Sequence, residues 1–228
     1  MSELLPNPLL WLDLETTGTK DDAQIIEVAC CLTRPDAPFD RVDAGHFHAL
    51  VEPTAPWSAP GEVVRMHAVN GLWNALATEP SHPIAEVEHQ LLAWLGKAVG
   101  GALVTPAGSG VAHYDVPLLR RLMPKVARRF TYYSLDVGVV RRWSDAIGEP
   151  LPEREPSTHR AWDDVLAALG FAAEMAERRR PRRVCSSCLA VIEYHEPTVL
   201  NAQGTRWSHY PTCPSSSSAD QSSGITMP

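Results

Sequence analysis

The most constraining part of this 228-residue sequence is an apolar segment near its start, residues 8–18, that carries two carboxylates. A run of large apolar residues before a Thr-Thr-Gly turn predicts a buried strand that ends at that turn. Side chains two positions apart on a strand point to the same face. Asp13 and Glu15 should therefore project together, with Leu12 and Leu14 packed on the other face. The alternative, an exposed strand with two solvated acids, fits poorly with so apolar a segment.

A second acidic position lies in the middle of the chain. Asp115 follows a stretch of small residues and precedes apolar residues at helical spacing, and Pro117 suits the first turn of a helix. Asp115 is therefore expected near a helix N-terminus. An aspartate at such a place can simply cap the helix; a metal-binding role is the competing hypothesis.

A third segment adds a histidine and two more acids. Residues 156–158 mark a helix start, and an Ala/Leu-rich run follows them. His159 and Asp164 are five residues apart, which is about 140° around one helix, so they would not share a helical face. The simplest solution places His159 in the entering turn and Asp164 in the helix. Asp163 competes with Asp164 for any functional role.

Carboxylates drawn from three distant segments are costly to bring together unless something positive neutralises them. Such a set indicates a pair of divalent cations. Sites with two metal ions are the usual machinery of phosphodiester cleavage.

These motifs resemble those of the DnaQ-like, DEDDh-type 3′–5′ exonucleases, in the family's order, over roughly residues 8–178. The resemblance implies an α/β fold, the RNase H-like mixed sheet flanked by helices. Strands are expected near residues 8–14, 24–33, 46–52 and 102–106. Helices are expected near residues 84–99, 116–129, 134–146 and 160–179. The family's spacing selects Asp164 and leaves Asp163 as a solvent-facing or supporting acid.

The resemblance also implies a role for each residue. Asp13 would bridge two Mg²⁺ or Mn²⁺ ions, Glu15 and Asp164 would complete the ligands of one, and Asp115 would hold the second. Oxygen ligands suit these ions. His159 would take the proton from the attacking water, since an imidazole with an unperturbed pKa near ~6.5 is a usable base at neutral pH. The predicted activity is release of nucleoside 5′-monophosphates from a 3′ end. The alternative is a degenerate exonuclease fold that serves as a nucleic-acid-binding adaptor.

Within the family, the sequence is most similar to the oligoribonuclease subgroup. Tyr132 matches a tyrosine that enters the partner subunit's site, which implies a homodimer, and His67 matches a histidine near the substrate. Ordinary packing is the alternative for Tyr132. The subgroup's tryptophan before that histidine is replaced by Glu62, and its Asp-Arg-Arg becomes Asp-Val-Pro here, which weakens the inference of the same short-RNA specificity.

The turn after the first acidic pair is also expected to contact substrate, through Thr16, Thr17 and Gly18, because glycine permits a close approach. The predicted partner is single-stranded DNA or RNA.

The formal net charge of −7 and the pI of about 5.7 do not favour nucleic acid binding, but they hide a local cluster of basic residues. These are Arg120, Arg121, Lys125, Arg128, Arg129, Arg141 and Arg142. Such a cluster could bind phosphates, or it could be a solvated helix face. The sequence contains neither a run of ~18 apolar residues nor a basic leader, so no membrane span or signal peptide is expected and the predicted location is the cytoplasm.

The end of the chain predicts a small metal-binding module. Cys185 and Cys188 form a Cys-x2-Cys pair, and His209 and Cys213 form a His-x3-Cys pair, which fits a structural Zn²⁺ site. A disulfide, unligated thiols, or His195 as a competing ligand remain open.

The expected organisation is an exonuclease domain over residues 1–179, an arginine-rich linker with the zinc module over 180–214, and a disordered Ser-rich tail over 215–228. Cys30 and Cys31 lie in an apolar run and are expected in the core.

Overall fold

The computed structural model describes residues 7–34, 39, 41–54, 57–149, 151, 157–179, 183–186, 188, 191–192, 198–200 and 206–209. The chain divides into two compact units, Met1–Glu177 and Arg178–Pro228. None of the helices in the described residues is long and apolar enough to cross a membrane.

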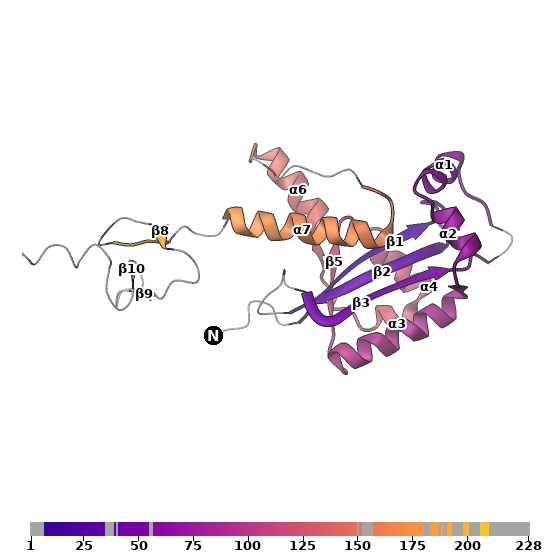
Figure 1. Ribbon diagram of the computed structural model, residues 1–228, viewed down its shortest axis with the longest axis horizontal. Coiled ribbons are helices and arrows are strands. Elements are labelled where there is room, and N and C mark those ends of the chain that lie inside the picture. Colours follow the sequence, from indigo (N-terminus) through magenta and orange to yellow (C-terminus); the bar gives the residue numbers. More distant parts are fainter. Residues whose placement is uncertain are drawn as a thin grey trace, which may run out of the picture. The chain divides into compact units, whose positions relative to one another are not determined.

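The first unit is built on a six-stranded mixed sheet with the order β4-β3-β2-β1-β5-β6 (Figure 1). Its strands are β1 (Leu9–Thr16), β2 (Ile25–Thr33), β3 (Arg41–Val51), β4 (Ser81–His82), β5 (Thr105–Gly108) and β6 (Leu135–Asp136). The central strand β1 is antiparallel to β2 and parallel to β5. Because β1 is central, the two acids that it carries lie inside the fold and not at an edge.

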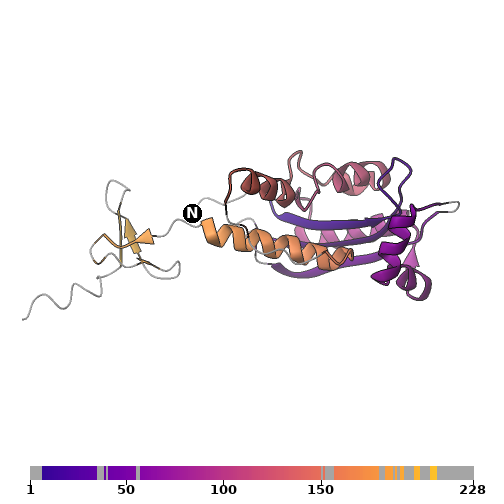
Figure 2. The ribbon, with the colours of Figure 1, turned by 90° about the horizontal axis from the view of Figure 1, so that it is seen from above.

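Helices complete the unit: α1 (Gly61–Val69), α2 (Leu72–Thr78), α3 (Ile84–Val99), α4 (Asp115–Leu122), α5 (Pro124–Ala127), α6 (Val137–Ala146) and α7 (Ala161–Arg179). Each face of the sheet packs on its own apolar cluster. Leu10, Leu12 and Leu14 of β1 belong to the cluster formed with α3, α4 and α5. Leu9 and Trp11 belong to the cluster formed with α7. Both views of the molecule show α7 running nearly along the strands (Figures 1 and 2).

The α/β mixed sheet with flanking helices confirms the expected architecture, but several elements differ from expectation. The helix expected over residues 116–129 is two helices. It breaks at Met123 because Pro124 lacks the amide hydrogen that would continue the first one. Helices α1 and α2, on either side of Asn70, were not expected, since that segment was interpreted only as the source of His67.

Cys30 and Cys31 are buried in the sheet, as expected. Two arginines of the basic cluster form hydrogen bonds within the fold. Arg121 donates to the carbonyl of Ala23, and Arg129 donates to two backbone carbonyls beyond α3. Two residues of the cluster, Arg121 and Arg129, are thus engaged by the fold itself, which leaves fewer of its side chains for binding phosphates.

The second unit contains two short antiparallel pairs, β7 (Arg183–Val184) with β8 (Val191–Ile192) and β9 (Thr198–Leu200) with β10 (Trp207–His209). Cys185 directly follows β7 and is buried, and Cys188 is half-buried. His209 ends β10. Cys213, the fourth predicted zinc ligand, lies outside the described residues, so the Zn²⁺ site stays a prediction.

Candidate active site

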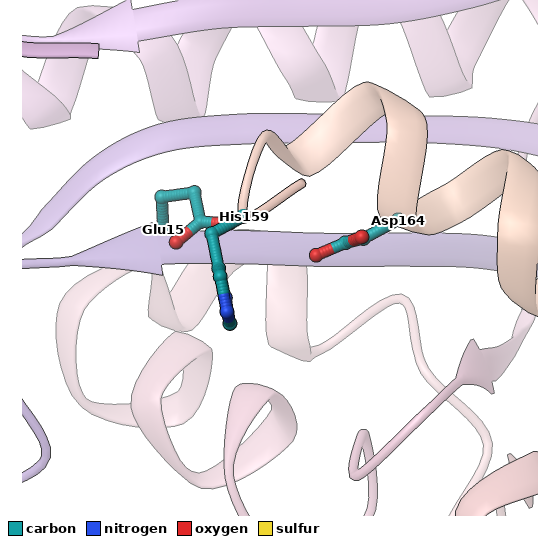
Figure 3. Close-up of side chains that lie close together, drawn as sticks. All are labelled: Glu15, His159 and Asp164. Atoms are coloured by element: carbon teal, nitrogen blue, oxygen red, sulfur yellow. The ribbon is translucent and has the colours of Figure 1, made fainter. Parts of the chain in front are cut away.

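Three of the five predicted catalytic residues meet at one point beside the end of β1. Ligand atoms of Glu15, His159 and Asp164 all lie within 4.8 Å of one another. Figure 3 shows Glu15 on β1, with His159 and Asp164 reaching the same place from the turn before α7 and from α7 itself. The strand and the helix that supply them are far apart in sequence, and the packing of α7 on the sheet brings them together.

The other two acids lie close to this cluster without belonging to it. Asp13 is on the same face of β1 as Glu15, and it lines a cavity together with His159 and Asp164. Asp115 is buried at the N-terminus of α4. Its carboxylate interacts with the backbone of Leu14, which fixes it beside β1.

The electrostatics of these acids show an excess of negative charge. Burial, followed by repulsion from Asp115, Glu15 and Asp164, raises the pKa of Asp13 well above its usual range. Burial, followed by repulsion from Asp164, raises the pKa of Glu15 to about 8. Burial also raises the pKa of Asp115 to about 7. Bound cations reduce the repulsion between carboxylates that are packed together and have raised pKa values.

The donor set fits divalent cations of the Mg²⁺ or Mn²⁺ type. The four acidic residues offer only carboxylate oxygens, which are the ligands those ions prefer. Asp163 is exposed and accepts a hydrogen bond from the Thr158 hydroxyl, whereas its neighbour Asp164 is half-buried in the cluster. Asp164 and not Asp163 therefore belongs to the acidic cluster.

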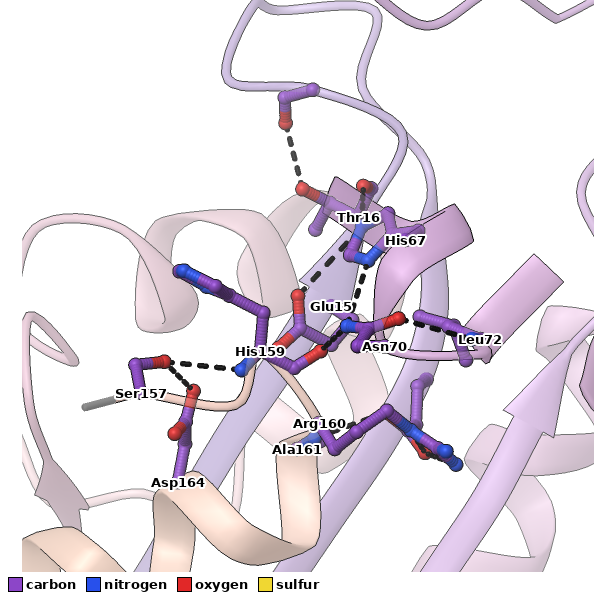
Figure 4. A network of polar contacts seen from close by, with 12 residues as sticks. Glu15, Thr16, His67, Asn70, Leu72, Ser157, His159, Arg160, Ala161 and Asp164 are labelled. Carbon is purple, nitrogen blue, oxygen red and sulfur yellow. Dashed lines mark hydrogen bonds and ion pairs between the residues drawn. The ribbon is translucent and has the colours of Figure 1, made fainter. Parts of the chain in front are cut away.

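The turn that carries His159 is held in an unusual backbone conformation. His159 has a positive φ of 53°, which is costly for a residue with a side chain and persists only when its surroundings enforce it. Asn70 donates from its side-chain amide to the carbonyl of His159 (Figure 4). The same amide donates to the carbonyl of Thr158. Ser157 accepts from the His159 backbone N–H and donates to Asp164 at 2.6 Å. These contacts link the turn to Asp164.

A buried carboxylate on the neighbouring strand holds the other side of that turn. Glu27 is directly opposite Glu15 in the β1–β2 pairing. It accepts hydrogen bonds from the guanidinium of Arg160, from the backbone N–H of Ala161 and from His48. Glu27, Arg160, Asn70 and Ser157 were not identified as site residues from the sequence. The only sequence signal was a charged residue within the apolar strand around Glu27.

The predicted substrate-binding residues fall into two groups. Thr16, Thr17 and His67 are buried beside the cluster. The Nε2 of His67 is 3.1 Å from the carbonyl of Thr16 and 3.8 Å from Glu15. Burial lowers the pKa of His67 and so disfavours its charged form. Tyr132 contacts Tyr133 and is 91% exposed, and it does not line the cavity.

Hydrogen bonds within the protein hold the turn after β1 in place. The hydroxyls of Thr16 and Tyr114 both donate to the carbonyl of Gly18. A Cβ at Gly18 would lie 3.3 Å from the ring of Pro60, so a side chain there would crowd that ring. Contact of Thr16, Thr17 and Gly18 with substrate remains a prediction.

Comparisons with known proteins agree with a hydrolytic site of this type on this fold. A family model described as Exonuclease, of the RNase T type, matches residues 10–171. The chain belongs to this exonuclease family, which confirms the expected DnaQ-like 3′–5′ exonuclease class and disfavours the degenerate adaptor.

Among its relatives is the oligoribonuclease of Neisseria meningitidis serogroup B, 30% identical over 169 residues that span 72% of this chain and 87% of the relative. The oligoribonuclease of Xanthomonas oryzae pv. oryzae is 32% identical over 164 residues, covering 69% of this chain and 81% of the relative.

Solved structures share the fold. The zinc-bound complex of Escherichia coli ExoI with single-stranded DNA has a TM-score of 0.59 at 19% identity, covering 77% of this chain. Exonuclease I of Methylocaldum szegediense has the same TM-score at 16% identity. The chain spans only 42% and 41% of these two structures, respectively.

Proposed function

We propose that this protein removes nucleotides from the 3′ end of single-stranded nucleic acid or short oligonucleotides and releases nucleoside 5′-monophosphates. The observation that carries the proposal is the convergence of Glu15, His159 and Asp164 within 4.8 Å, next to Asp13. Similarity to oligoribonucleases over most of their length supports short oligonucleotides as substrates.

In this proposal Asp13, Glu15 and Asp164 would hold one divalent cation, and Asp115 together with Asp13 would hold a second. Such cations would neutralise the buried carboxylates and supply positive charge for the attacking and leaving oxygens. The oxygen ligands supplied by this chain fit Mg²⁺ or Mn²⁺.

His159 acts as the general base. Its ring is exposed at the edge of the acidic cluster, where an attacking water can reach it. One ring nitrogen accepts a proton from that water as the water oxygen bonds to the scissile phosphorus, and the 3′ oxygen of the preceding nucleotide leaves. Asn70 and Ser157 hold the backbone of His159, so the turn that carries the ring is already in place before the reaction.

The direct test is incubation of the purified protein with a 5′-labelled oligonucleotide and Mg²⁺. A ladder that shortens from the 3′ end, together with nucleoside 5′-monophosphates in the products, is expected, and EDTA should abolish both. Parallel reactions with short RNA, single-stranded DNA and mismatched duplex identify the preferred substrate. Products that carry a 3′-phosphate would contradict the proposed direction of cleavage.

We further propose a homodimer in which Tyr132 of each chain contributes to the partner's site. The 91% exposure of this aromatic side chain supports a role outside its own fold. Mixing inactive Asp13→Ala chains with Tyr132→Ala chains should restore activity if the residues act across subunits. A strictly monomeric, fully active protein would contradict the dimer.

The structural Zn²⁺ site proposed for Cys185, Cys188, His209 and Cys213 completes the picture of the chain. Residues 180–214 form too short a segment to fold on an apolar core alone, which supports a metal-stabilised module.

A further inference from the structure

A cavity of about 470 Å³ begins at the catalytic cluster and extends away from it between α6 and α7. Its inner end is lined by Asp13, His159 and Asp164, and its outer part by Arg141, Gly170 and Phe171. A volume of this size is typical of a ligand site and exceeds what the reacting groups alone need. The part between the two helices, here called the α6–α7 groove, is not used by the mechanism above.

Protein fills the side of the cluster where His67 lies against Glu15. Thr17 and His67 are buried there, and the turn after β1 is fixed by hydrogen bonds to Gly18. An enzyme that shortens a polymer from its end needs a closed side for the terminus and an open path for the remaining strand. The α6–α7 groove is an open path that starts at the acids.

The groove also carries the charge that a nucleic acid strand requires. Arg141 is the one fixed positive charge among the described residues that line it. Its guanidinium lies 5.1 Å from the ring centroid of Phe171, which holds the side chain over the groove. Phe171 is seven residues beyond Asp164 on α7, or about 10 Å along the helix axis. In a stacked nucleic acid strand the phosphates advance ~3.4 Å per nucleotide along the axis. A second or third phosphate would therefore lie at that distance from the cluster.

The other residues that line the groove suit the nucleobases of a bound strand. Small residues of α7, among them Ala167 and Gly170, leave the space open, and Phe171 offers an aromatic ring. Aromatic and apolar surfaces accept bases of any sequence. Glu174 lines the groove one turn beyond Phe171 and would repel a phosphate there, which confines the phosphate position to the vicinity of Arg141.

We infer that the α6–α7 groove binds the nucleotides on the 5′ side of the scissile phosphate, and that Arg141 binds one of their phosphates. This inference rests on the proposed exonuclease function and deepens it, because it assigns longer oligonucleotides a contact that a dinucleotide without a 5′-phosphate cannot make. Arg141 is then a specificity-determining residue for substrate length. A guanidinium fork is well matched to a phosphate group.

The first test compares Arg141→Ala with Arg142→Ala on a dinucleotide and on a hexanucleotide. Arg142 is the matched control, because it is the next residue on α6, is exposed and does not line the cavity. Arg141→Ala should raise KM for the hexanucleotide about tenfold, or ~1.4 kcal/mol, and leave the dinucleotide within about twofold. The salt dependence of hexanucleotide binding should fall by a slope of ~0.7, the value for one lost phosphate contact on a single strand.

The second test fills the groove. Gly170 lines the groove, and a Cβ there meets no atom within 4 Å apart from its own helix, so the side chain of Gly170→Leu would begin in open space. Hexanucleotide binding should weaken while dinucleotide hydrolysis persists. The matched control is Gly96→Leu, since Gly96 is also an exposed helical glycine with nothing within 4 Å but lies on α3.

Binding of a labelled hexanucleotide in Ca²⁺ separates this inference from the proposed function. If the wild-type protein hydrolyses no oligonucleotide, the proposed function fails, and the groove assignment still stands if Arg141→Ala and Gly170→Leu weaken binding while both controls do not. If hydrolysis occurs but Arg141→Ala changes dinucleotide and hexanucleotide equally, or changes neither, the groove assignment is wrong.

Discussion

Arg160 on the catalytic turn and Glu27 in the middle of the sheet are 133 residues apart in sequence, and their side chains meet at 2.8 Å. Glu27 is 1% exposed. It also accepts the backbone N–H of Ala161 at 3.0 Å. This carboxylate therefore ties the start of α7 to β2, and it fixes the residue that follows His159.

Because Glu27 is charged in the folded protein, we expect the stability of the protein toward unfolding to depend on pH in the acid range. Burial alone would raise its pKa, but hydrogen bonds from His48, Arg160 and Ala161 outweigh that effect and lower the pKa to about 2. Because the folded-state pKa lies below the ordinary value of 4.5, the stabilisation is fully present above pH 4.5 and is lost as pH falls toward 2. Its size at neutral pH is roughly 3 kcal/mol.

Denaturant unfolding of the wild-type protein and of Glu27→Gln at pH 7 and pH 3 checks this prediction. The variant should be less stable at pH 7, and the difference should narrow at pH 3. Glu62→Gln, an exposed glutamate in the first turn of α1, serves as the control and should show no such convergence. A stability difference between Glu27→Gln and wild type that does not depend on pH would contradict the assigned charge interaction.

Removing a metal ligand should abolish turnover and leave the fold intact. Asp13→Ala and Asp164→Ala are each expected to reduce activity to below about a tenth in saturating Mg²⁺, because metal-ion catalysis contributes several kcal/mol. Without metal, each variant should unfold at the same temperature as the metal-free wild type or at a higher one. Each variant lacks one of the carboxylates that repel one another in the cluster.

The exposed neighbour Asp163 is the matched control, and Asp163→Ala should keep most of the activity. Thermal unfolding with and without Mg²⁺ gives a readout independent of turnover. Mg²⁺ should raise the unfolding temperature of the wild type and of Asp163→Ala more than that of Asp164→Ala. Equal stabilisation of all three would rule out Asp164 as a ligand.

The proposed general base predicts a specific kinetic signature. His159→Ala should lower kcat by ~10²–10⁴-fold, the usual range for loss of such a group. The wild-type activity–pH profile should rise along a limb that the variant lacks. His89→Ala, at an exposed position on α3, should retain both kcat and the limb. If His159→Ala keeps the limb, another group is the base.

The second unit predicts about one zinc per chain in purified protein. Cys185→Ser should lose the metal, and a chain ending after Arg180 should lose it while still hydrolysing dinucleotides, because α7 ends at Arg179 and the two sites use different ligands. Metal analysis and thiol titration provide the measurements. Protein that stays zinc-free after expression in zinc-rich medium would refute the proposed site.

Much of the catalytic set follows from local sequence. Alternation along β1 places Asp13 and Glu15 on one face and Leu12 and Leu14 on the other, and the apolar clusters confirm the two faces. This works because the two-residue period of a strand is fixed by its backbone, whatever the rest of the fold does.

Other features depended on contacts between distant segments. The pairing of Glu27 with Arg160, and that of Asn70 with the turn at His159, join elements that no local pattern connects. The hydrogen bonds from Arg129 to backbone carbonyls are of the same kind, since the sequence left its basic cluster open between phosphate binding and a solvated helix face. Periodicity determined which residues share a face. Only the packing of α7 on the sheet decided which carboxylates meet and which one is paired with an arginine. It also decided which side of the site stays open. Burial and charge pairing depend on the whole fold, so no local pattern could show them.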